Sequence, residues 1–144
     1  MNTIKQVSIF IENTKGRLAE VCILLGKHNI NIKALTIAES PEFGILRVVL
    51  DNTDKAKNIL KDNGFIVTIA TVVAVEVSDT PGGLAKGLNV LANNNINLEY
   101  MYGFVEKARD KALMVLKFDS PKRAIEILQK NNIPIIEEKI ALGL

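Results

Sequence analysis

The feature that most constrains this chain is an internal repeat, because residues 13–32 return 66 positions later as residues 79–98. The first copy reads NTKGRLAEVCILLGKHNINI and the second reads DTPGGLAKGLNVLANNNINL. The identical pairs are Thr14/Thr80, Gly16/Gly82, Leu18/Leu84, Ala19/Ala85, Leu25/Leu91, Asn29/Asn95, Ile30/Ile96 and Asn31/Asn97. The match then continues at a spacing of 68, as with Asp51 and Asp119, so the second copy carries a two-residue insertion. Two copies of about 68 residues are too few for a solenoid and favour a pseudo-symmetric pair of small units.

Composition restricts the class of protein. The 144 residues are 48% hydrophobic and 24% charged, which is typical of a soluble globular chain. The net charge of +2 comes from interspersed lysines, arginines and acids, so we expect no nucleic-acid surface and no membrane anchor. The longest apolar run, residues 66–75, is too short to span a bilayer, and no secretory signal is recognisable at residues 1–16. The single cysteine, Cys22, excludes an intrachain disulfide and favours a cytoplasmic location.

Hydrophobic periodicity predicts the same order of elements in both copies. In the first copy, strands are expected at residues 6–12, 30–38, 44–50 and 65–72. Thr14 is the expected N-cap of the first helix, and residues 51–53 are expected to cap the second helix, which ends before Gly64. In the second copy, Ser120 and Pro121 are expected to begin the second helix, and Glu137 and Glu138 fall on the predicted last strand.

Each unit therefore reads as βαββαβ. Right-handed crossovers give an antiparallel sheet in the order 4-1-3-2 with both helices on one face, which is the ferredoxin-like α+β arrangement. The predicted units are residues 1–72 and 73–144.

Catalytic and metal-binding signatures are missing. His28 is the one histidine, at a predicted helix end, and Cys22 falls on the predicted inward stripe of the first helix, where a buried structural thiol is expected. No metal-ligand spacing, nucleophile elbow or phosphate-binding loop is present, so we expect neither an enzyme nor a cofactor or metal site. The predicted third strands also lack the aromatic residues of an RNA-recognition module.

The turn between the first strand and the first helix is the best candidate for a ligand site. It reads ENTKGRLAE in one copy and SDTPGGLAK in the other. A helix N-terminus presents unpaired N–H groups to a carboxylate, glycines let a ligand approach the backbone, and Asn13 or Asp79 can hold an ammonium group. The same residues also make an ordinary helix start, and the spacing alone favours helix capping over a ligand site.

The pattern [ND]-T-x-G-x-L-A followed by N-I-N-[IL], after an apolar strand, resembles the ACT domain, a ligand-sensing module with this fold. The resemblance covers nearly the whole chain, twice. The chain is similar to small proteins made of two ACT units. It implies that units pair through their second strands and bind amino acids between the first loop of one unit and the second strand of the other. Carried onto this sequence, one implied site consists of Asn13, Thr14, Lys15, Gly16, Arg17 and Leu18 with Tyr100, Met101, Tyr102 and Gly103. The other consists of Asp79, Thr80, Pro81, Gly82, Gly83 and Leu84 with Ala34, Leu35, Thr36 and Ile37.

The two implied sites differ in sequence. The family usually carries proline before the loop glycine, so Lys15 departs from the pattern where Pro81 conforms, and Arg17 stands where the second copy has Gly83. Tyr100 and Tyr102 serve either packing or ligand contact.

The resemblance implies a non-catalytic sensor that binds an amino acid, forms a homodimer and acts on an enzyme of amino-acid metabolism. The alternative is an assembly subunit comparable to the regulatory subunit of an acetolactate synthase. The sequence does not identify the amino acid or the partner.

Overall fold

The computed structural model describes residues 2–12, 14–39, 41–105 and 111–143 and divides the chain into two compact units. One unit is Lys5–Ala70, which holds most of the first copy of the repeat. The other is Thr71–Leu144 together with Met1–Ile4. The predicted strand at residues 65–72 continues without a break into the second copy as a single strand, β4 (Ile66–Ser78), so the chain passes from one unit to the other within a strand.

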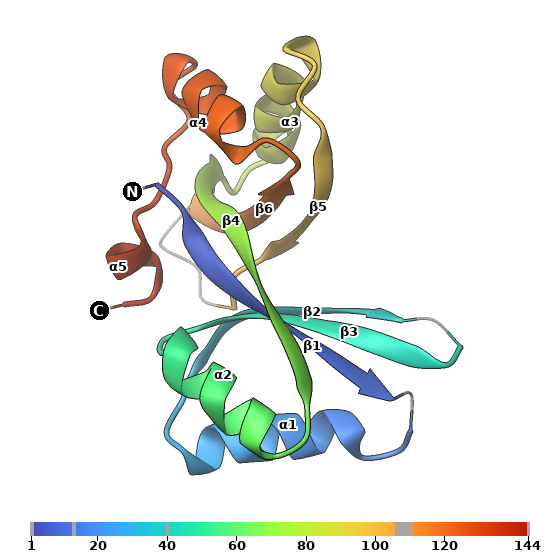
Figure 1. Ribbon diagram of the computed structural model, residues 1–144. Helices are drawn as coiled ribbons and strands as arrows, with labels where there is room; N and C mark the ends of the chain where they lie inside the picture. Colours follow the sequence, from blue (N-terminus) through green and yellow to red (C-terminus); the bar gives the residue numbers. More distant parts are fainter. Residues whose placement is uncertain (1, 13, 40, 106–110, 144) are drawn as a thin grey trace. The chain divides into compact units, whose positions relative to one another are not determined.

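The unit Lys5–Ala70 has the predicted topology. Its elements are β1 (Ile4–Glu12), α1 (Arg17–Lys27), β2 (Ile32–Glu39), β3 (Phe43–Leu50), α2 (Thr53–Asp62) and the first part of β4. The strand order β2-β3-β1-β4 is the predicted 4-1-3-2 order, and β3 is antiparallel to both β1 and β2. Figure 1 shows α1 and α2 side by side on one face of these strands. The ferredoxin-like α+β class is confirmed.

The core of this unit lies between the sheet and the two helices, as the alternation in the sequence predicts. Alternate residues of β1 and β3 point to the helices, and α1 and α2 each add two fully buried side chains. The central members are Val7, Ile9, Ile11, Leu46, Val48, Leu50, Val21, Leu25, Ala56 and Leu60. Because this face is fully buried, a slip of one residue in either strand would expose the apolar set, which fixes the register.

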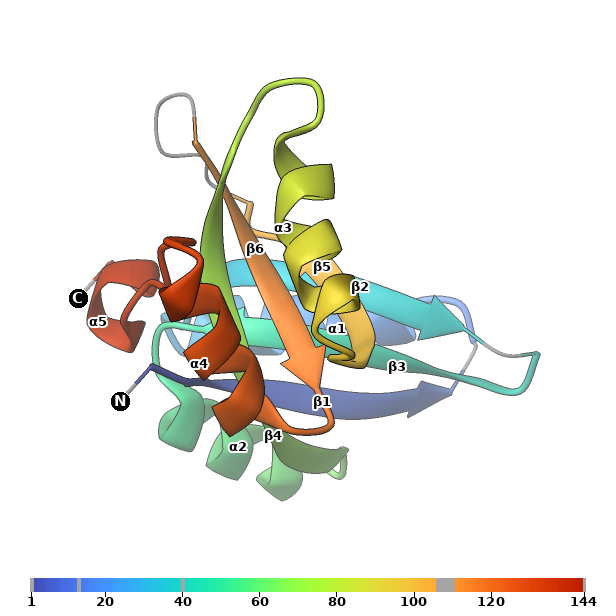
Figure 2. The same cartoon turned by 90° about the horizontal axis from the view of Figure 1, so that it is seen from above.

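The second unit repeats this plan up to its last element. It contains the second part of β4, α3 (Gly83–Asn93), β5 (Leu98–Gly103), β6 (Lys111–Phe118), α4 (Pro121–Lys130) and α5 (Glu138–Ala141). The strand order is β4-β6-β5, and α3 and α4 lie side by side against these strands (Figure 2). Leu91, Leu116, Phe118, Ala124 and Leu128 belong to the core.

The predicted fourth strand of the second copy is wrong. The chain after α4 pairs with β4 only at one bridge, Val75 with Ile135, and then enters α5, so Glu137 caps this short helix and Glu138 begins it. Two backbone hydrogen bonds mark the contact, from Glu76 N–H to the Pro134 carbonyl (3.0 Å) and from Ile136 N–H to the Ala74 carbonyl (2.9 Å). Pro134 has no N–H to donate, which limits strand pairing at this point.

The predicted start of α1 is also wrong, by two residues. The N-cap of α1 is Gly16 rather than Thr14, and Gly82 is the corresponding N-cap of α3; both glycines are in the left-handed conformation (φ 87° and 83°). The N-terminal ends of α2 and α4 lie where the sequence predicts them. The Asn52 side chain caps α2 by accepting a hydrogen bond from Lys55 N–H (3.2 Å), and Ser120 precedes the first helical proline of α4.

Two further residues can be placed. Cys22 is half-buried, not buried as predicted, because the fully buried positions of α1 are Val21 and Leu25. His28 is the exposed C-cap of α1, and its carbonyl accepts a hydrogen bond from the Lys55 ammonium (2.8 Å). None of the helices built from the described residues is long and apolar enough to cross a membrane.

Candidate functional site

Among the described residues of the loop between β1 and α1, none bonds to the first free N–H groups of the helix. Thr14 N–H bonds to the Glu12 carbonyl (2.8 Å) and Arg17 N–H to the Thr14 carbonyl (3.3 Å), which turns the chain tightly into the helix. The first intrahelical bond is Glu20 N–H to the Gly16 carbonyl (3.0 Å). The N–H groups of Leu18 and Ala19 therefore precede the helical ladder, and no described side chain caps this helix. Asn13, the predicted ammonium ligand, lies outside the described residues.

The loop between β4 and α3 has the same backbone design. Gly83 N–H bonds to the Thr80 carbonyl (2.9 Å) and Lys86 N–H to the Gly82 carbonyl (3.1 Å), so the N–H groups of Leu84 and Ala85 occupy the corresponding open positions. The Ser78 and Thr80 hydroxyls bond to each other (3.1 Å), and Asp79 is exposed. This chemistry suits a carboxylate, because unpaired N–H groups and the helix dipole both favour negative charge.

The loop glycines do not all have the role expected of them. A Cβ atom at Gly16 or Gly82 would meet nothing within 4 Å, and both residues have positive φ. A Cβ atom at Gly83 would lie 1.9 Å from the Ser78 carbonyl oxygen. Gly83 is therefore required by close packing of the protein's own backbone, and space for a ligand is not needed to explain it.

Arg17 already has partners within its own copy. Its guanidinium lies over the Phe65 ring, 4.3 Å from the centroid, and forms an ion pair with Glu20 (2.6 Å). These contacts hold the side chain against its own unit, so its predicted role in ligand binding requires that they be released or shared.

Three predicted residues are brought together inside the first unit. Thr14, Leu18 and Ile37 line a cavity of about 190 Å³. The remaining lining residues are Ile11, Glu12, Glu39 and Gly44. The two implied sites had assigned Thr14 and Leu18 to one set and Ile37 to the other. Lys15 is exposed next to this loop, and on β2 Leu35 is exposed, Thr36 is half-buried and Ala34 is buried.

On the second strand of the other copy, β5, the two tyrosines share one face of the sheet. Tyr100 and Tyr102 stack with their ring centroids 6.5 Å apart and the rings inclined by 19°. Met101 and Gly103 pair with Leu116 and Met114, which pack into the helix-covered core. The tyrosines therefore point to the face of the sheet opposite the helices.

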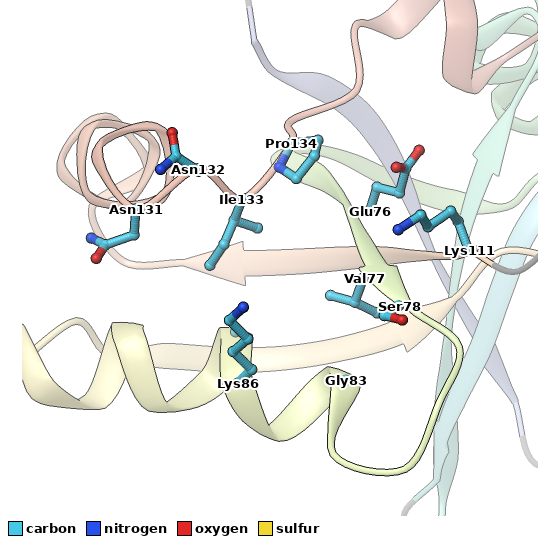
Figure 3. Close-up of a pocket in the computed structure, with 11 residues that line it drawn as sticks. Glu76, Val77, Ser78, Gly83, Lys86, Lys111, Asn131, Asn132, Ile133 and Pro134 are labelled. Atoms are coloured by element: carbon cyan, nitrogen blue, oxygen red, sulfur yellow. The ribbon is translucent and has the colours of Figure 1, made fainter.

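A second cavity is lined mainly by residues that the sequence did not single out, together with the loop glycine Gly83. It has a volume of about 320 Å³ and lies within the second unit, at the edge of β4 where the last strand is missing. Glu76, Ser78, Lys86, Lys111, Asn132 and Ile133 are among its lining residues (Figure 3). The signal that could have found it is a difference between the copies, because Gly83 and Ile133 stand where the first copy has Arg17 and Phe65. The structure describes no group of three or more histidine, cysteine or acidic side chains placed to hold a metal, within the ranges given above.

A family model described as "ACT domain pair" matches residues 2–143. The chain belongs to this family. The ACT resemblance of the loop and N-I-N motifs is thereby confirmed.

Solved structures agree with this membership of the ACT domain pair family. Protein BT0572 from Bacteroides thetaiotaomicron is 39% identical, with a TM-score of 0.92 over 99% of this chain and 98% of that chain. The ligand-free regulatory subunit of aspartate kinase from Thermus thermophilus has a TM-score of 0.64 at 16% identity, covering 89% of this chain and 92% of that chain, which shows a shared fold.

A curated relative is much longer than this ACT domain pair. "Protease Do-like 8, chloroplastic" from Arabidopsis thaliana is 26% identical over 136 residues, which are 90% of this chain and 30% of the relative. The chain thus spans about a third of that protein's length.

Proposed function

We propose that this ACT domain pair protein is a non-catalytic regulatory sensor that binds an amino acid through its two glycine-containing loops. The observation that carries the proposal is the duplicated helix entrance, in which Gly16 and Gly82 take the same left-handed conformation and the described residues leave two N–H groups of each helix start without a partner. A carboxylate is the ligand group that these N–H groups favour. Family membership over residues 2–143 supports the ligand-sensing role.

The loops alone hold a carboxylate but do not discriminate between side chains. We propose that the second strands supply this selectivity. The pairing implied by the family joins the first loop to Tyr100–Gly103 and the second loop to Ala34–Ile37. The stacked tyrosines are aromatic, with Tyr100 half-buried and Tyr102 buried, whereas the Ala34–Ile37 segment carries small and aliphatic side chains. The two sites are therefore expected to differ in preference.

A screen of the purified full chain against the twenty amino acids by thermal shift tests the proposal. A ligand that binds only the folded protein raises the melting temperature by mass action. At a hundredfold excess over Kd, it increases the free energy of unfolding by about 2.7 kcal/mol. One amino acid or a few related ones should raise it in a concentration-dependent way. A flat response to all twenty at 10 mM (roughly the limit of millimolar affinity) contradicts the sensor proposal.

A second candidate function, docking to a larger enzyme, is favoured by the exposed apolar side chains of the edge strand β2. Leu35 and Ile37 are both 40% exposed on this strand, and an exposed apolar edge invites pairing with another chain. The Thermus thermophilus relative in fold is itself a regulatory subunit of aspartate kinase.

We propose that the chain forms a homodimer in the cytoplasm and acts on an enzyme of amino-acid metabolism. Sedimentation of the chain with and without the amino acid from the screen measures its self-association.

A further inference from the structure

The second unit has an apolar groove on its helix side, at the point where α4 ends beside α3. Val77 and Ile133 lie opposite Gly87 of α3, because a Cβ atom at Gly87 would be 3.8 Å from Val77 Cγ1 and 4.0 Å from Ile133 Cδ1. Gly83 and Lys86 line the same cavity from the first turn of α3 (Figure 3). These five residues define what we call the α3–α4 groove.

Three differences between the copies open this groove. In the order of the repeat, the first copy has Arg17, Val21 and Phe65 where the second has Gly83, Gly87 and Ile133. In the first copy the Arg17 guanidinium covers the Phe65 ring, 4.3 Å from its centroid, and Val21 is fully buried. In the second copy two of these three side chains are missing and the third is smaller. A volume that side chains fill in the first unit is therefore open in the second.

The charges beside the groove also differ between the copies. Glu20 and Asp62 of the first copy correspond to Lys86 and Lys130 of the second, and both lysines are exposed. Glu126 is the one acidic residue in the sequences of α3 and α4. A balanced pair of helices in the first unit thus corresponds to a predominantly basic pair in the second.

The basic side chains of α4 lie along the junction with α3. Arg123 Nη2 donates a hydrogen bond to the carbonyl of Asn94, the C-cap of α3 (3.0 Å). Lys130 follows seven residues later, so it lies on the same side of α4, about 10 Å further along the helix. It also precedes Asn131, which lines the cavity. Positive charge therefore extends over two helical turns, from the groove to the far end of α3.

We propose that the α3–α4 groove docks an acidic segment of a partner protein. An apolar side chain of that segment enters the groove, and its carboxylates lie beside Lys86, Lys130 and Arg123. An apolar anchor in a pocket, surrounded by complementary charge, is a common arrangement in protein interfaces. A peptide segment can follow the row of charges along the two helices. The inference goes beyond the proposed sensor function, because this docking requires no amino acid and uses neither second strand.

Fluorescence anisotropy of labelled peptides with the full chain tests the proposal. The probe EELEELEE carries both acidic and apolar side chains and should bind, more weakly as salt is raised, because salt screens exposed charges. The matched peptide EEAEEAEE lacks the large apolar side chains and should bind about tenfold more weakly or worse. The charge-reversed KKLKKLKK should not bind. Equal binding of the two acidic peptides, or no saturable binding of EELEELEE, overturns the proposal.

Variants that restore features of the first copy locate the surface. Gly87→Val introduces the side chain that Val21 supplies in the first copy, so it should weaken EELEELEE by about tenfold or more and leave EEAEEAEE unchanged. Gly87→Ala, whose Cβ atom fits at ordinary contact distance, should give a smaller loss in the same direction.

A charge exchange tests the other half of the surface. Lys86→Glu combined with Lys130→Asp restores the first copy's charges and should weaken both acidic peptides by about tenfold or more. Lys61→Glu is the matched control, because it reverses a charge at an exposed position of α2 in the first unit, and it should bind as the parent does.

The remaining outcomes identify other occupants. Equal peptide affinity in the parent, Gly87→Val and the charge-exchanged variant overturns the assignment to this surface. An oligothymidylate of equal charge that binds as tightly as EELEELEE shows recognition of nucleic acid and overturns the peptide assignment. If EELEELEE does not bind but Gly87→Val changes the sedimentation of the chain, the groove accepts a second copy and the proposal fails. The amino-acid screen tests the sensor function independently of all these results.

Discussion

Gly83→Ala should be the most destabilising of the glycine-to-alanine changes in the helix entrances. The new Cβ atom would lie 1.9 Å from the Ser78 carbonyl oxygen, more than 1 Å inside the 3.0 Å that real Cβ atoms observe. The opposing atom is backbone, so the end of β4 or the start of α3 must move. Forcing atoms into packed space costs about 1–3 kcal/mol, and a backbone clash of this depth belongs at the upper end of that range.

Two other glycines provide controls of known mechanism. Gly16→Ala introduces no contact within 4 Å but places a side chain at φ 87°, which costs about 1–2 kcal/mol. Gly26→Ala lies in α1 with open space around it and should stabilise the protein by about 0.5–1 kcal/mol. The expected order of stability is Gly26→Ala above the parent, then Gly16→Ala, then Gly83→Ala.

Urea titration followed by far-UV circular dichroism measures this order through the transition midpoint, with the slope as a check that the same surface is exposed. A Gly83→Ala variant as stable as Gly26→Ala would refute the close approach of Ser78. The explanation of the open cavity in the second copy would then fail with it.

Four further substitutions test the packing of the two copies. Leu60→Ala and Leu128→Ala remove equivalent buried side chains and should each cost about 2–5 kcal/mol in urea titrations; a cost below that range at either position argues against its buried placement. Asn52→Ala removes the hydrogen bond to the first turn of α2 and should cost about 1 kcal/mol by the same measurement, whereas an unchanged midpoint would show that the cap contributes nothing. Arg17→Ala removes the stack on Phe65 and should cost about 0.5–1 kcal/mol, with a smaller cost in the Phe65→Leu background if the two side chains interact.

The repeat and its periodicity were enough to predict the topology, because strand alternation and helix spacing are local patterns that occur independently in each copy. Val7, Ile9 and Ile11 define the buried face of β1 in the sequence as they do in the structure. The strand order followed from crossover handedness, which depends on chirality and on no particular residue.

The errors occurred where a local preference met a constraint from elsewhere. Thr14 has the chemistry of an N-cap, but the left-handed Gly16 begins α1 two residues later. The apolar run after Asn132 has the composition of a strand, but Pro134 restricts its pairing and the chain turns into α5. Both outcomes depend on backbone geometry that composition does not reveal.

The candidate sites also differ in how far the sequence alone reveals them. The loops could be found from a motif, since the glycine and the helix entrance are adjacent in sequence. The contact of Arg17 with Phe65, and the cavity that its absence leaves beside Ile133, join residues nearly fifty positions apart. Such pairs become visible from sequence only when the two copies are compared position by position.

A ¹⁵N–¹H correlation titration of the full chain, with the amino acid that gives the largest thermal shift, tests the central claim most directly. Amide resonances report each N–H group without altering the fold. We expect the largest, saturable shifts at Leu18 and Ala19, at Leu84 and Ala85, or at both pairs, because these groups receive the ligand carboxylate. Saturable binding that leaves all four amides unmoved would contradict the account.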